Sequence, residues 1–248
     1  MLSIYNIIIK FFGFAIKIHS LYNQKSQQWI DGRKDIFFRL EKEITNNKNI
    51  VWFHCASHGE YEQVNQLISE YKNNFPKDKI LLTFFSPSGF NNVKKNDCID
   101  WIFYLPLDTQ KNAKKFIKLV MPKKVFFVKS EFWYNYMNQL SLYKIPLYHV
   151  SCVFDKEKFS IFSSFSTEIL SKSKHFFVQD KNSLDVLNSI NIKNSSITGD
   201  TRFDSILENI KNKKEDQRIL EFCLDKTTII FASVWHEDEH IFKKFIKE

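Results

Sequence analysis

From Asn49 to about residue 198, short apolar runs alternate with amphipathic stretches, and this alternation constrains the fold more than any other feature of the chain. The apolar runs are rich in β-branched and aromatic side chains, as buried strands are, and the stretches between them have helical spacing. Strands separated by helices form βαβ units, whose strands pair in parallel. We therefore predict an α/β fold with a doubly wound parallel sheet. The expected strands are 49–54, 79–85, 101–105, 124–129, 146–151, 174–178 and 195–198, and the expected helices are 58–74, 88–96, 109–120, 131–143, 160–171 and 181–190.

The first of these strands runs directly into Ser57-His58-Gly59-Glu60, which places a carboxylate in the first turn of the following helix. Open α/β sheets bind ligands beyond the carboxyl ends of their strands, so Glu60 is a candidate base for a bound hydroxyl. The same residues also form a capping box, in which Glu60 only accepts a hydrogen bond from the Ser57 backbone. A helix N-terminus favours the ionised carboxylate, which weakens the base unless burial offsets the effect. Both interpretations stay open at this point.

The net charge of +8 and the pI of about 9.1 suit anionic partners, namely phosphorylated lipid, an anionic membrane or nucleic acid. Aromatic side chains fall in the apolar runs and no nucleic-acid module is recognisable, so nucleic acid is the weaker choice. The four cysteines form no C-x-x-C pair and are predicted to be reduced thiols of a cytosolic protein. His54, Cys55 and His58 lack the fourth ligand and the shared helical face of a zinc site. No carboxylate cluster requires a divalent ion, so we predict metal independence and no cofactor.

Residues 1–22 form a strongly apolar segment with one narrow polar stripe. On a helix this stripe contains Ser3, Asn6, Lys10, Gly13, Lys17 and Ser20. The pattern predicts a membrane-associated helix that lies in the interface, with lysines toward headgroups and Phe and Ile toward acyl chains. Two alternatives stay open: a helix that covers the core of the domain, and a tilted transmembrane span with snorkelling lysines.

Toward the other end, residues 205–216 are polar and rich in lysine, and they are expected to form a hinge between domains. Residues 227–233 have the pattern of the first strand of a new sheet, and residues 236–248 that of a helix. One strand and one or two helices cannot bury a core of their own. We therefore expect residues 217–248 to be the start of a second α/β domain in a truncated chain.

A series of short motifs is distributed along the chain. They are Trp29-x-x-Gly32-Arg33-Lys34, Trp52-x-His54-x-x-Ser57-x-Gly59-Glu60, the stretch Leu82 to Gly89, Leu105-Pro106-Leu107-Asp108, Lys129-x-Glu131-x-Trp133-x-Asn135, Gln179-Asp180, Gly199 to Asp204, and Ser233-x-Trp235-x-Glu237-Asp238-Glu239. In this order they resemble the Kdo transferases of lipopolysaccharide synthesis, which carry 3-deoxy-manno-octulosonic acid (Kdo) from its CMP ester to a lipid A precursor. The stretch from Ala232 to His236 departs from the family, which more often has Gly-Ser-Thr-Trp-Pro there.

The resemblance implies a two-domain glycosyltransferase of the GT-B type at the cytoplasmic face of the inner membrane. Residues 23–204 would be the acceptor-binding domain, and the donor, CMP-Kdo, would bind the second domain. In such enzymes Glu60 matches the base, and Glu131 and Arg202 match residues that support the transition state. The motifs also imply acceptor-binding residues Ser57, Gly59, Ser86, Ser88, Gly89 and Lys129, and donor-binding residues Ser233, Trp235 and Glu239. CMP-binding motifs would lie beyond Glu248, so the chain alone is expected to be inactive.

The proposed chemistry is attack of a sugar hydroxyl on the anomeric carbon of Kdo, and each residue has a structural alternative. Arg202 is a candidate for the Kdo carboxylate or the leaving phosphate, or else pairs with Asp200 or Asp204. Glu131 is expected near Glu60 across neighbouring strand ends, where the pKa of one of the two carboxyl groups would rise and leave a base and a charge stabiliser, or else it complements a helix dipole. The Ser86, Ser88 and Gly89 loop suits a phosphate or sugar, or is an ordinary turn and cap.

Three functions therefore compete. The first is a Kdo transferase that acts on lipid A precursor. The second is a GT-B transferase that uses another nucleotide sugar. The third is a non-catalytic module that binds phosphorylated lipid at an anionic membrane surface through its basic face. A serine hydrolase is poorly supported because Ser57 does not lie in a G-x-S-x-G elbow.

Overall fold

The computed structural model describes residues 2–44, 47–155, 163–211, 217–225 and 227–245. The chain divides into two compact units, residues 1–208 and residues 209–248, and each is described by itself.

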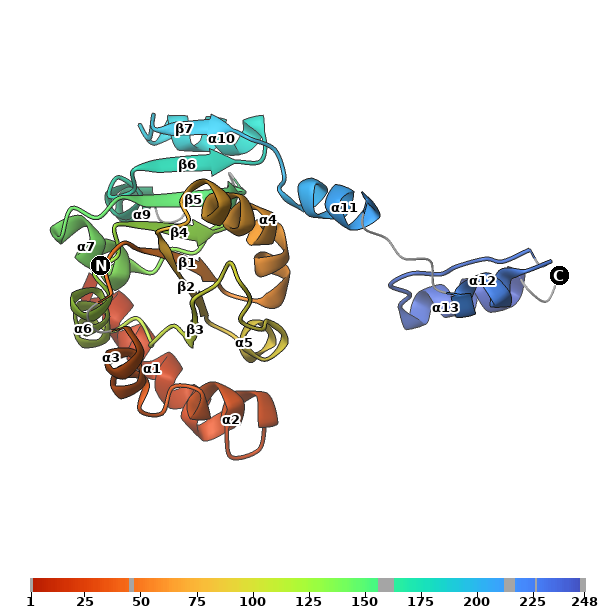
Figure 1. Cartoon of the computed structure of the whole chain (residues 1–248), viewed down its shortest axis with the longest axis horizontal. Coiled ribbons are helices and arrows are strands. Elements are labelled where there is room, and N and C mark those ends of the chain that lie inside the picture. Colours follow the sequence, from red (N-terminus) through yellow and green to blue (C-terminus); the bar gives the residue numbers. More distant parts are fainter. Residues whose placement is uncertain (1, 45–46, 156–162, 212–216, 226, 246–248) are drawn as a thin grey trace. The chain divides into compact units, whose positions relative to one another are not determined.

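The first unit is built on a sheet of seven parallel strands (Figure 1). They are β1 (Ile50–Cys55), β2 (Lys79–Phe84), β3 (Trp101–Tyr104), β4 (Lys124–Val128), β5 (Leu147–Cys152), β6 (His175–Val178) and β7 (Ser195–Ile197). Each begins and ends within one residue of the predicted bounds, and the predicted doubly wound parallel sheet is confirmed. The strand order is β3-β2-β1-β4-β5-β6-β7, so the order reverses between β1 and β4. A crevice for ligands opens at such a reversal, beyond the carboxyl ends of the two strands.

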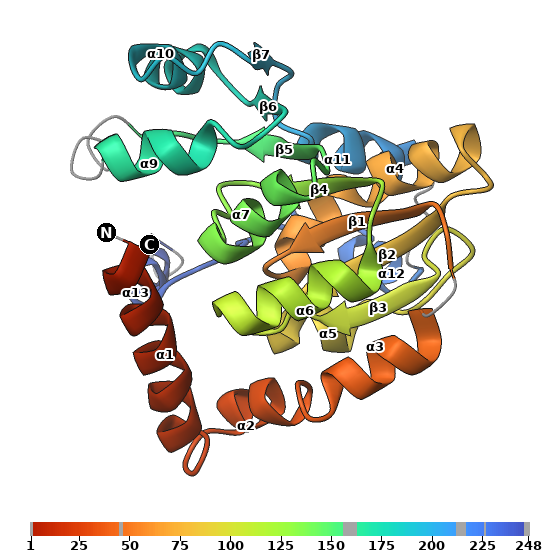
Figure 2. The same ribbon diagram turned by 90° about the vertical axis from the view of Figure 1, so that its left-hand side faces the viewer.

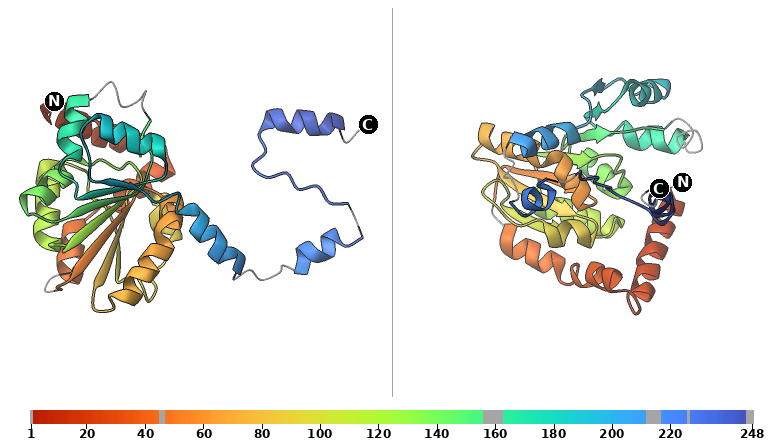
Figure 3. Two further views of the ribbon diagram at one scale, coloured as in Figure 1. Left: turned by 90° about the horizontal axis from the view of Figure 1, so that it is seen from above. Right: turned by 90° about the vertical axis from the view of Figure 1, so that its right-hand side faces the viewer.

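Successive side chains of the strands enter two separate cores, one on each face of the sheet. In β1, Ile50 and Trp52 join the first core, whereas Val51, Phe53 and Cys55 join the second. The first core is covered by α3 (Ile36–Ile44), α6 (Gln110–Val120), α7 (Tyr134–Leu142), α9 (Ser163–Leu170) and α10 (Lys181–Ser189). The second is covered mainly by α4 (His58–Asn74), beside the short α5 (Pro87–Asn92). The two layers of helices flank the fan of strands in Figures 2 and 3.

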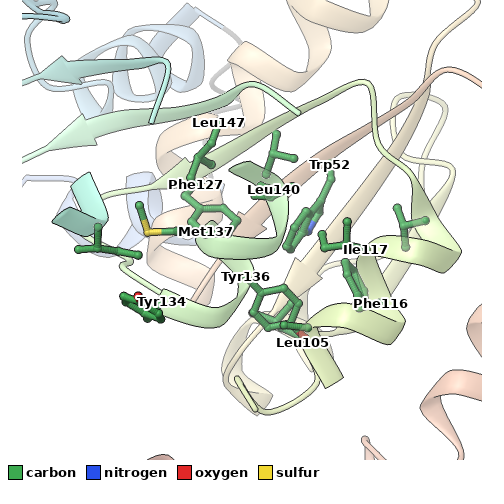
Figure 4. Close-up of a cluster of buried hydrophobic side chains, with 14 of the residues drawn as sticks. Trp52, Leu105, Phe116, Ile117, Phe127, Tyr134, Tyr136, Met137, Leu140 and Leu147 are labelled. Atoms are coloured by element: carbon green, nitrogen blue, oxygen red, sulfur yellow. The ribbon is translucent and has the colours of Figure 1, made fainter. Parts of the chain in front are cut away.

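Aromatic side chains fill the first core around Trp52, which is fully buried (Figure 4). Its ring lies 4.9 Å from that of Phe116, 5.2 Å from that of Phe127 and 5.7 Å from that of Tyr136, centre to centre. The indole N–H donates to Thr83 Oγ1 at 2.7 Å, so the polar group of this large side chain is satisfied. Aromatic packing around Trp52 thus forms the centre of this core.

The N-terminal helix α1 (Leu2–His19) docks on this unit through one face, followed by α2 (Gln24–Asp31). Two residues of its polar stripe face the domain. Asn6 accepts a hydrogen bond from Asn135 Nδ2 at 2.9 Å, and a Cβ on Gly13 would lie 2.6 Å from Leu107. Small and polar side chains here let the helix approach the domain closely, whereas Ile4, Ile7, Ile8, Phe11, Phe14 and Ile18 stay exposed.

Of the helices that the structure describes, α1 alone has the length and apolar composition to cross a membrane.

The second unit contains α12 (Gln217–Cys223) and α13 (His236–Phe245). The predicted strand at residues 227–233 does not form, and its Ile229 and Ile230 are exposed. A strand requires a neighbour that accepts and donates ladder hydrogen bonds, and these residues have none in the part of the chain described. The predicted connection 205–216 is helical as far as Lys211, in α11 (Arg202–Lys211), and residues 212–216 lie outside the described residues. Residues 160–162 and 246–248, at the ends of two predicted helices, also lie outside them.

All four cysteines, each within the described residues, carry free thiols. Cys55 and Cys152 are fully buried, whereas Cys98 and Cys223 are partly accessible.

Candidate active site

Glu60 stands in the first turn of α4, directly beyond the carboxyl end of β1, and is largely buried. Its carboxylate bends back and accepts a hydrogen bond from the Ala56 N–H. The Ser57 side chain makes no capping bond, so the structure has only the Glu60 half of the capping box. Burial raises the pKa of Glu60, and the backbone N–H groups of Ala56 and Ser57 and the charge of Lys129 oppose that rise. The Ala56 N–H bond thus holds the carboxylate in place and favours its charged form.

Glu131 lies in the loop after β4, and the predicted helix that would begin with it starts only at Tyr134. The helix-dipole interpretation of Glu131 is therefore wrong. The reason is Asp108, whose carboxylate accepts hydrogen bonds from the Asn135 and Tyr136 N–H groups at 3.1 and 3.0 Å and so caps the helix there. Burial, and then the charge of Glu60, raise the pKa of Glu131 to about 7.

These two carboxylates share a cavity of about 300 Å³ at the carboxyl edge of the sheet. Its walls are Glu60, Lys129, Ser130, Glu131, Val153, Gln179 and Arg202. They come from the segments that follow β1, β4, β5, β6 and β7, which are five of the seven strands of the sheet. The predicted residues Glu60, Lys129, Glu131 and Arg202 are thereby brought together.

Two cations, Lys129 and Arg202, line the same cavity as the two carboxylates. Lys129 has a φ of 59°, a left-handed conformation that is uncommon for a residue with a side chain and that clusters at functional sites. Arg202 donates to Asp200 through Nε at 2.7 Å and Nη2 at 2.5 Å. This is the salt bridge that the sequence offered as the alternative to ligand binding. The Arg202 side chain is nevertheless 61% exposed, whereas that of Asp200 is only 11% exposed. The guanidinium is therefore held at the rim of the cavity and can exchange its partner for an anionic ligand.

The loop after β2 does not line this cavity. Ser86 and Ser88 hydrogen-bond to each other through their hydroxyls at 2.7 Å. A Cβ on Gly89 would meet the Phe84 ring at 2.0 Å, so the close approach of α5 to β2 requires glycine there. Ser57 and Gly59 adjoin Glu60 in the chain, and Gly59 is exposed with open space at its Cα. Packing against Phe84 therefore explains why residue 89 is a glycine. The hydroxyls of Ser86 and Ser88 bind each other, as in an ordinary turn.

The two histidines near Glu60 do not form a joint site. His54 is fully buried, and burial lowers its pKa to about 3. Its Nε2 accepts the Trp133 indole N–H at 3.2 Å, and its Nδ1 lies 2.9 Å from Thr83 Oγ1. His58 instead points to Glu62 on the exposed side of α4, at 3.6 Å. Within the described residues no group of three or more His, Cys, Asp or Glu is placed to hold a metal ion.

The predicted donor residues belong to the second unit. Ser233 has a φ of 56°, Trp235 is 76% exposed, and Glu239 lies 3.4 Å from Lys243.

Sequence reasoning missed Ser130, Val153 and Gln179 as wall residues. Each stands one or two residues beyond a strand, so a search of every strand end would have found them. Gln179 donates to Ser151 Oγ at 2.9 Å, and Ser151 has a φ of 59° where the β5–β6 pairing shifts register. That irregularity turns the end of β5 in a way that a strand pattern does not reveal.

The arrangement can remove a proton and stabilise negative charge. Glu60 offers a carboxyl group whose pKa is raised by burial, and the pKa of Glu131 is raised to about 7, which suits general acid–base chemistry. Lys129 and Arg202 supply positive charge for a carboxylate or phosphate.

Comparison with solved structures identifies the fold. The first unit is similar to UDP-GlcNAc 2-epimerase from Neisseria meningitidis in complex with UDP-GlcNAc, at TM-score 0.53 and 14% identity, over 72% of this chain and 55% of that one. A second UDP-N-acetylglucosamine 2-epimerase matches at TM-score 0.51 and 15% identity, over 70% of this chain and 51% of that one. The fold is that of a Rossmann-like N-terminal domain of the GT-B type.

Sequence comparison identifies the family. Residues 32–205 match the family described as 3-deoxy-D-manno-octulosonic-acid transferase (kdotransferase). The transferase of that name from Rickettsia bellii is 26% identical over 85% of this chain and 51% of its own length, and that from Aquifex aeolicus is 38% identical over 39% and 27%. The chain spans about half the length of the curated relatives that it matches most broadly. By this match the chain belongs to the Kdo transferase family, whose members are glycosyltransferases of lipopolysaccharide biosynthesis.

Proposed function

We propose that the protein transfers Kdo from CMP-Kdo to a lipid A precursor, and that residues 23–204 supply the acceptor side of the site. Family membership supports Kdo as the transferred sugar. The observation that carries the proposal is the cavity where Glu60 and Glu131 meet Lys129 and Arg202 beyond the ends of β1 and β4.

In the proposed reaction, Glu60 takes the proton of an acceptor hydroxyl as its oxygen bonds to the anomeric carbon of Kdo. The bond from that carbon to the CMP phosphate breaks, and CMP leaves with the electron pair, in an inverting, metal-independent displacement. Arg202 binds the Kdo carboxylate or the departing phosphate, and the charge of Lys129 opposes the rise that burial causes in the pKa of Glu60. Glu131 adds a second carboxyl group that stabilises the developing positive charge.

The remaining assignments follow from the same proposal. Ser57 and Gly59 border the acceptor beside Glu60, and Ser233, Trp235 and Glu239 belong to the donor side. The exposed apolar face of α1 holds the protein at the cytoplasmic face of the inner membrane, where Kdo transferases act.

The test is Glu60→Gln in the full-length enzyme, with CMP-Kdo and lipid A precursor in mixed vesicles. Because the variant keeps the shape but cannot accept a proton, kcat should fall at least about 100-fold, the lower end of general-base effects. Glu62→Gln is the matched control, since Glu62 lies in the same helical turn and its side chain is 49% exposed. Unchanged transfer in Glu60→Gln would remove Glu60 as the base.

A second candidate function is a non-catalytic module that binds phosphorylated lipid at a membrane surface. The exposed apolar face of α1 favours it, because that face is available to lipid whether or not chemistry follows. Wild-type protein that binds acceptor vesicles but transfers no sugar from any nucleotide donor would support this candidate.

A further inference from the structure

Helix α1 contacts the first turn of α7, just after the loop that carries Glu131. Tyr5 lies on the docked face of α1 and reaches the buried carboxylate of Asp108, donating its phenol proton to Oδ2 at 2.5 Å. The same phenol oxygen accepts the Tyr134 N–H at 3.3 Å. Tyr134 is the first residue of α7, three positions after Glu131. A side chain of the N-terminal helix therefore helps to cap the helix that begins next to the candidate active site.

Asp108 completes this cap. Its carboxylate also accepts the N–H groups of Asn135 and Tyr136, at 3.1 and 3.0 Å, so three donors converge on it. These backbone groups have no partner within a helix, and they require acceptors from outside. With Tyr5 and Asp108 in place, the first three N–H groups of α7 are satisfied, and the point at which the Glu131 loop joins the helix is held.

A second contact runs parallel to the first. The Phe12 ring of α1 stacks on Phe85 at 6.0 Å between centres, and Phe85 stacks on Trp133 at 4.8 Å. The Trp133 indole N–H bonds His54 Nε2 at 3.2 Å and also favours the ionised form of Glu131. Both residues that flank the junction, Trp133 and Tyr134, are thus held by contacts that lead back to α1.

From these contacts we infer that Tyr5 is a positioning residue for Glu131, acting through Asp108 and the first turn of α7. The inference rests on the proposed function, and it makes α1 a part of the acceptor site in addition to a membrane contact. Burial, then the charge of Asp108 and, as a smaller cause, the charge of Glu131 raise the pKa of Tyr5, so the phenol keeps the proton that it donates.

Helix α1 contacts the domain through one face and exposes the opposite face. Tyr5, Asn6, Ile9, Phe12 and Gly13 face the domain. At 100° per residue, Ile4, Ile7, Ile8, Phe11, Phe14 and Ile18 fall on the opposite side, and all are exposed. Contact of the exposed face with lipid therefore leaves Tyr5 on Asp108.

The experiment compares Tyr5→Phe with wild type in the full-length enzyme. The variant removes one oxygen and keeps the ring, which lies 5.8 Å from that of Tyr134. We expect kcat to fall about tenfold, with KM for the acceptor and binding to acceptor vesicles unchanged, because small misplacement of a reacting group costs rate. Amide hydrogen exchange at residues 130–133 should become faster. Tyr22→Phe is the matched control, because Tyr22 is 88% exposed.

Two readouts separate this inference from the proposed function. If wild-type enzyme transfers no Kdo, the proposed function fails, and exchange at residues 130–133 alone decides the positioning role. Unchanged exchange and unchanged kcat in Tyr5→Phe would overturn the inference, as would a loss of kcat that only follows a loss of vesicle binding. Asp108→Asn provides the second variant. If it reproduces the loss, and adds nothing to Tyr5→Phe, the two residues act through one cap.

Discussion

At the scale of residues, two carboxyl groups in one cavity acquire different properties from their surroundings. Glu60 accepts backbone N–H bonds and faces Lys129, so the forces that favour its charge partly offset burial. Glu131 has fewer such partners, and the charge of Glu60 adds to its burial. When the surroundings give two carboxyl groups different pKa values, one can act as the charged group while the other exchanges a proton.

The pKa of Glu131 provides a test of this coupling that does not depend on activity. In Glu60→Gln the negative charge beside Glu131 is absent, so the pKa of Glu131 should fall from about 7 toward its ordinary value of 4.5, while burial keeps it above that value. Carbon-detected NMR titration of the Glu131 carboxyl measures the shift. Glu62→Gln should leave the titration unchanged, and an unshifted pKa in Glu60→Gln would show that the two groups are not coupled.

At the scale of elements, Arg33 joins three segments that are distant in the sequence. Its guanidinium donates to Leu105 O at 2.8 Å, to Phe85 O at 2.7 Å and to Trp29 O at 3.0 Å. It also stacks over the Trp29 ring at 3.6 Å. Burial lowers the pKa of Arg33 to about 9, yet the group remains charged at neutral pH. The Gly-Arg motif after α2 therefore ties α2 to the carboxyl ends of β2 and β3.

Arg33→Lys should lower the free energy of unfolding by roughly 2–3 kcal/mol, because an ammonium group cannot reproduce the planar fork or the stacking and leaves buried carbonyls without donors. Urea unfolding followed by circular dichroism measures the loss. Lys34→Arg, at the adjacent position with a side chain 68% exposed, should be nearly neutral. Equal stability of Arg33→Lys and wild type would contradict the structural role given to the three bonds.

The strands were predictable because each is an apolar run bounded by polar turns, a purely local signal. The start of α7 was not, since it depends on Asp108, which lies 26 residues before Tyr134 in the chain. The gathering of Glu60 and Glu131 followed from the rule for open sheets, but it required that β1 and β4 be neighbours, and only the structure gives that order. Residues 227–233 have the local pattern of a strand but do not form one, because a strand also requires a neighbouring strand to pair with.

At the scale of the whole molecule, the surface combines a net positive charge with one coherent apolar face. The charge of +8 attracts anionic lipid over a distance, and the exposed face of α1 can then bury its side chains among acyl chains. Lys10 and Lys17 are themselves exposed on α1, where they can contact headgroups.

Phe11→Ser should weaken partition into anionic vesicles by about 2 kcal/mol, roughly 30-fold, the value of one large apolar side chain. Stability should hardly change, because Phe11 is 68% exposed. Met121→Ser is the control, since Met121 is 54% exposed at the opposite, amino edge of the sheet. Sedimentation with vesicles of differing anionic content measures both. Equal losses in the two variants would deny α1 a special role.

The placement of the four thiols has a practical consequence. Burial raises the pKa of Cys55 and of Cys152, so neither offers the reactive thiolate that maleimide reagents need. Cys98 and Cys223 are accessible, and one belongs to each unit. The native sequence can therefore carry a pair of spin labels without mutation. Double electron–electron resonance would measure the distance between the two labels, and its change when a nucleotide sugar is added would report movement of the units.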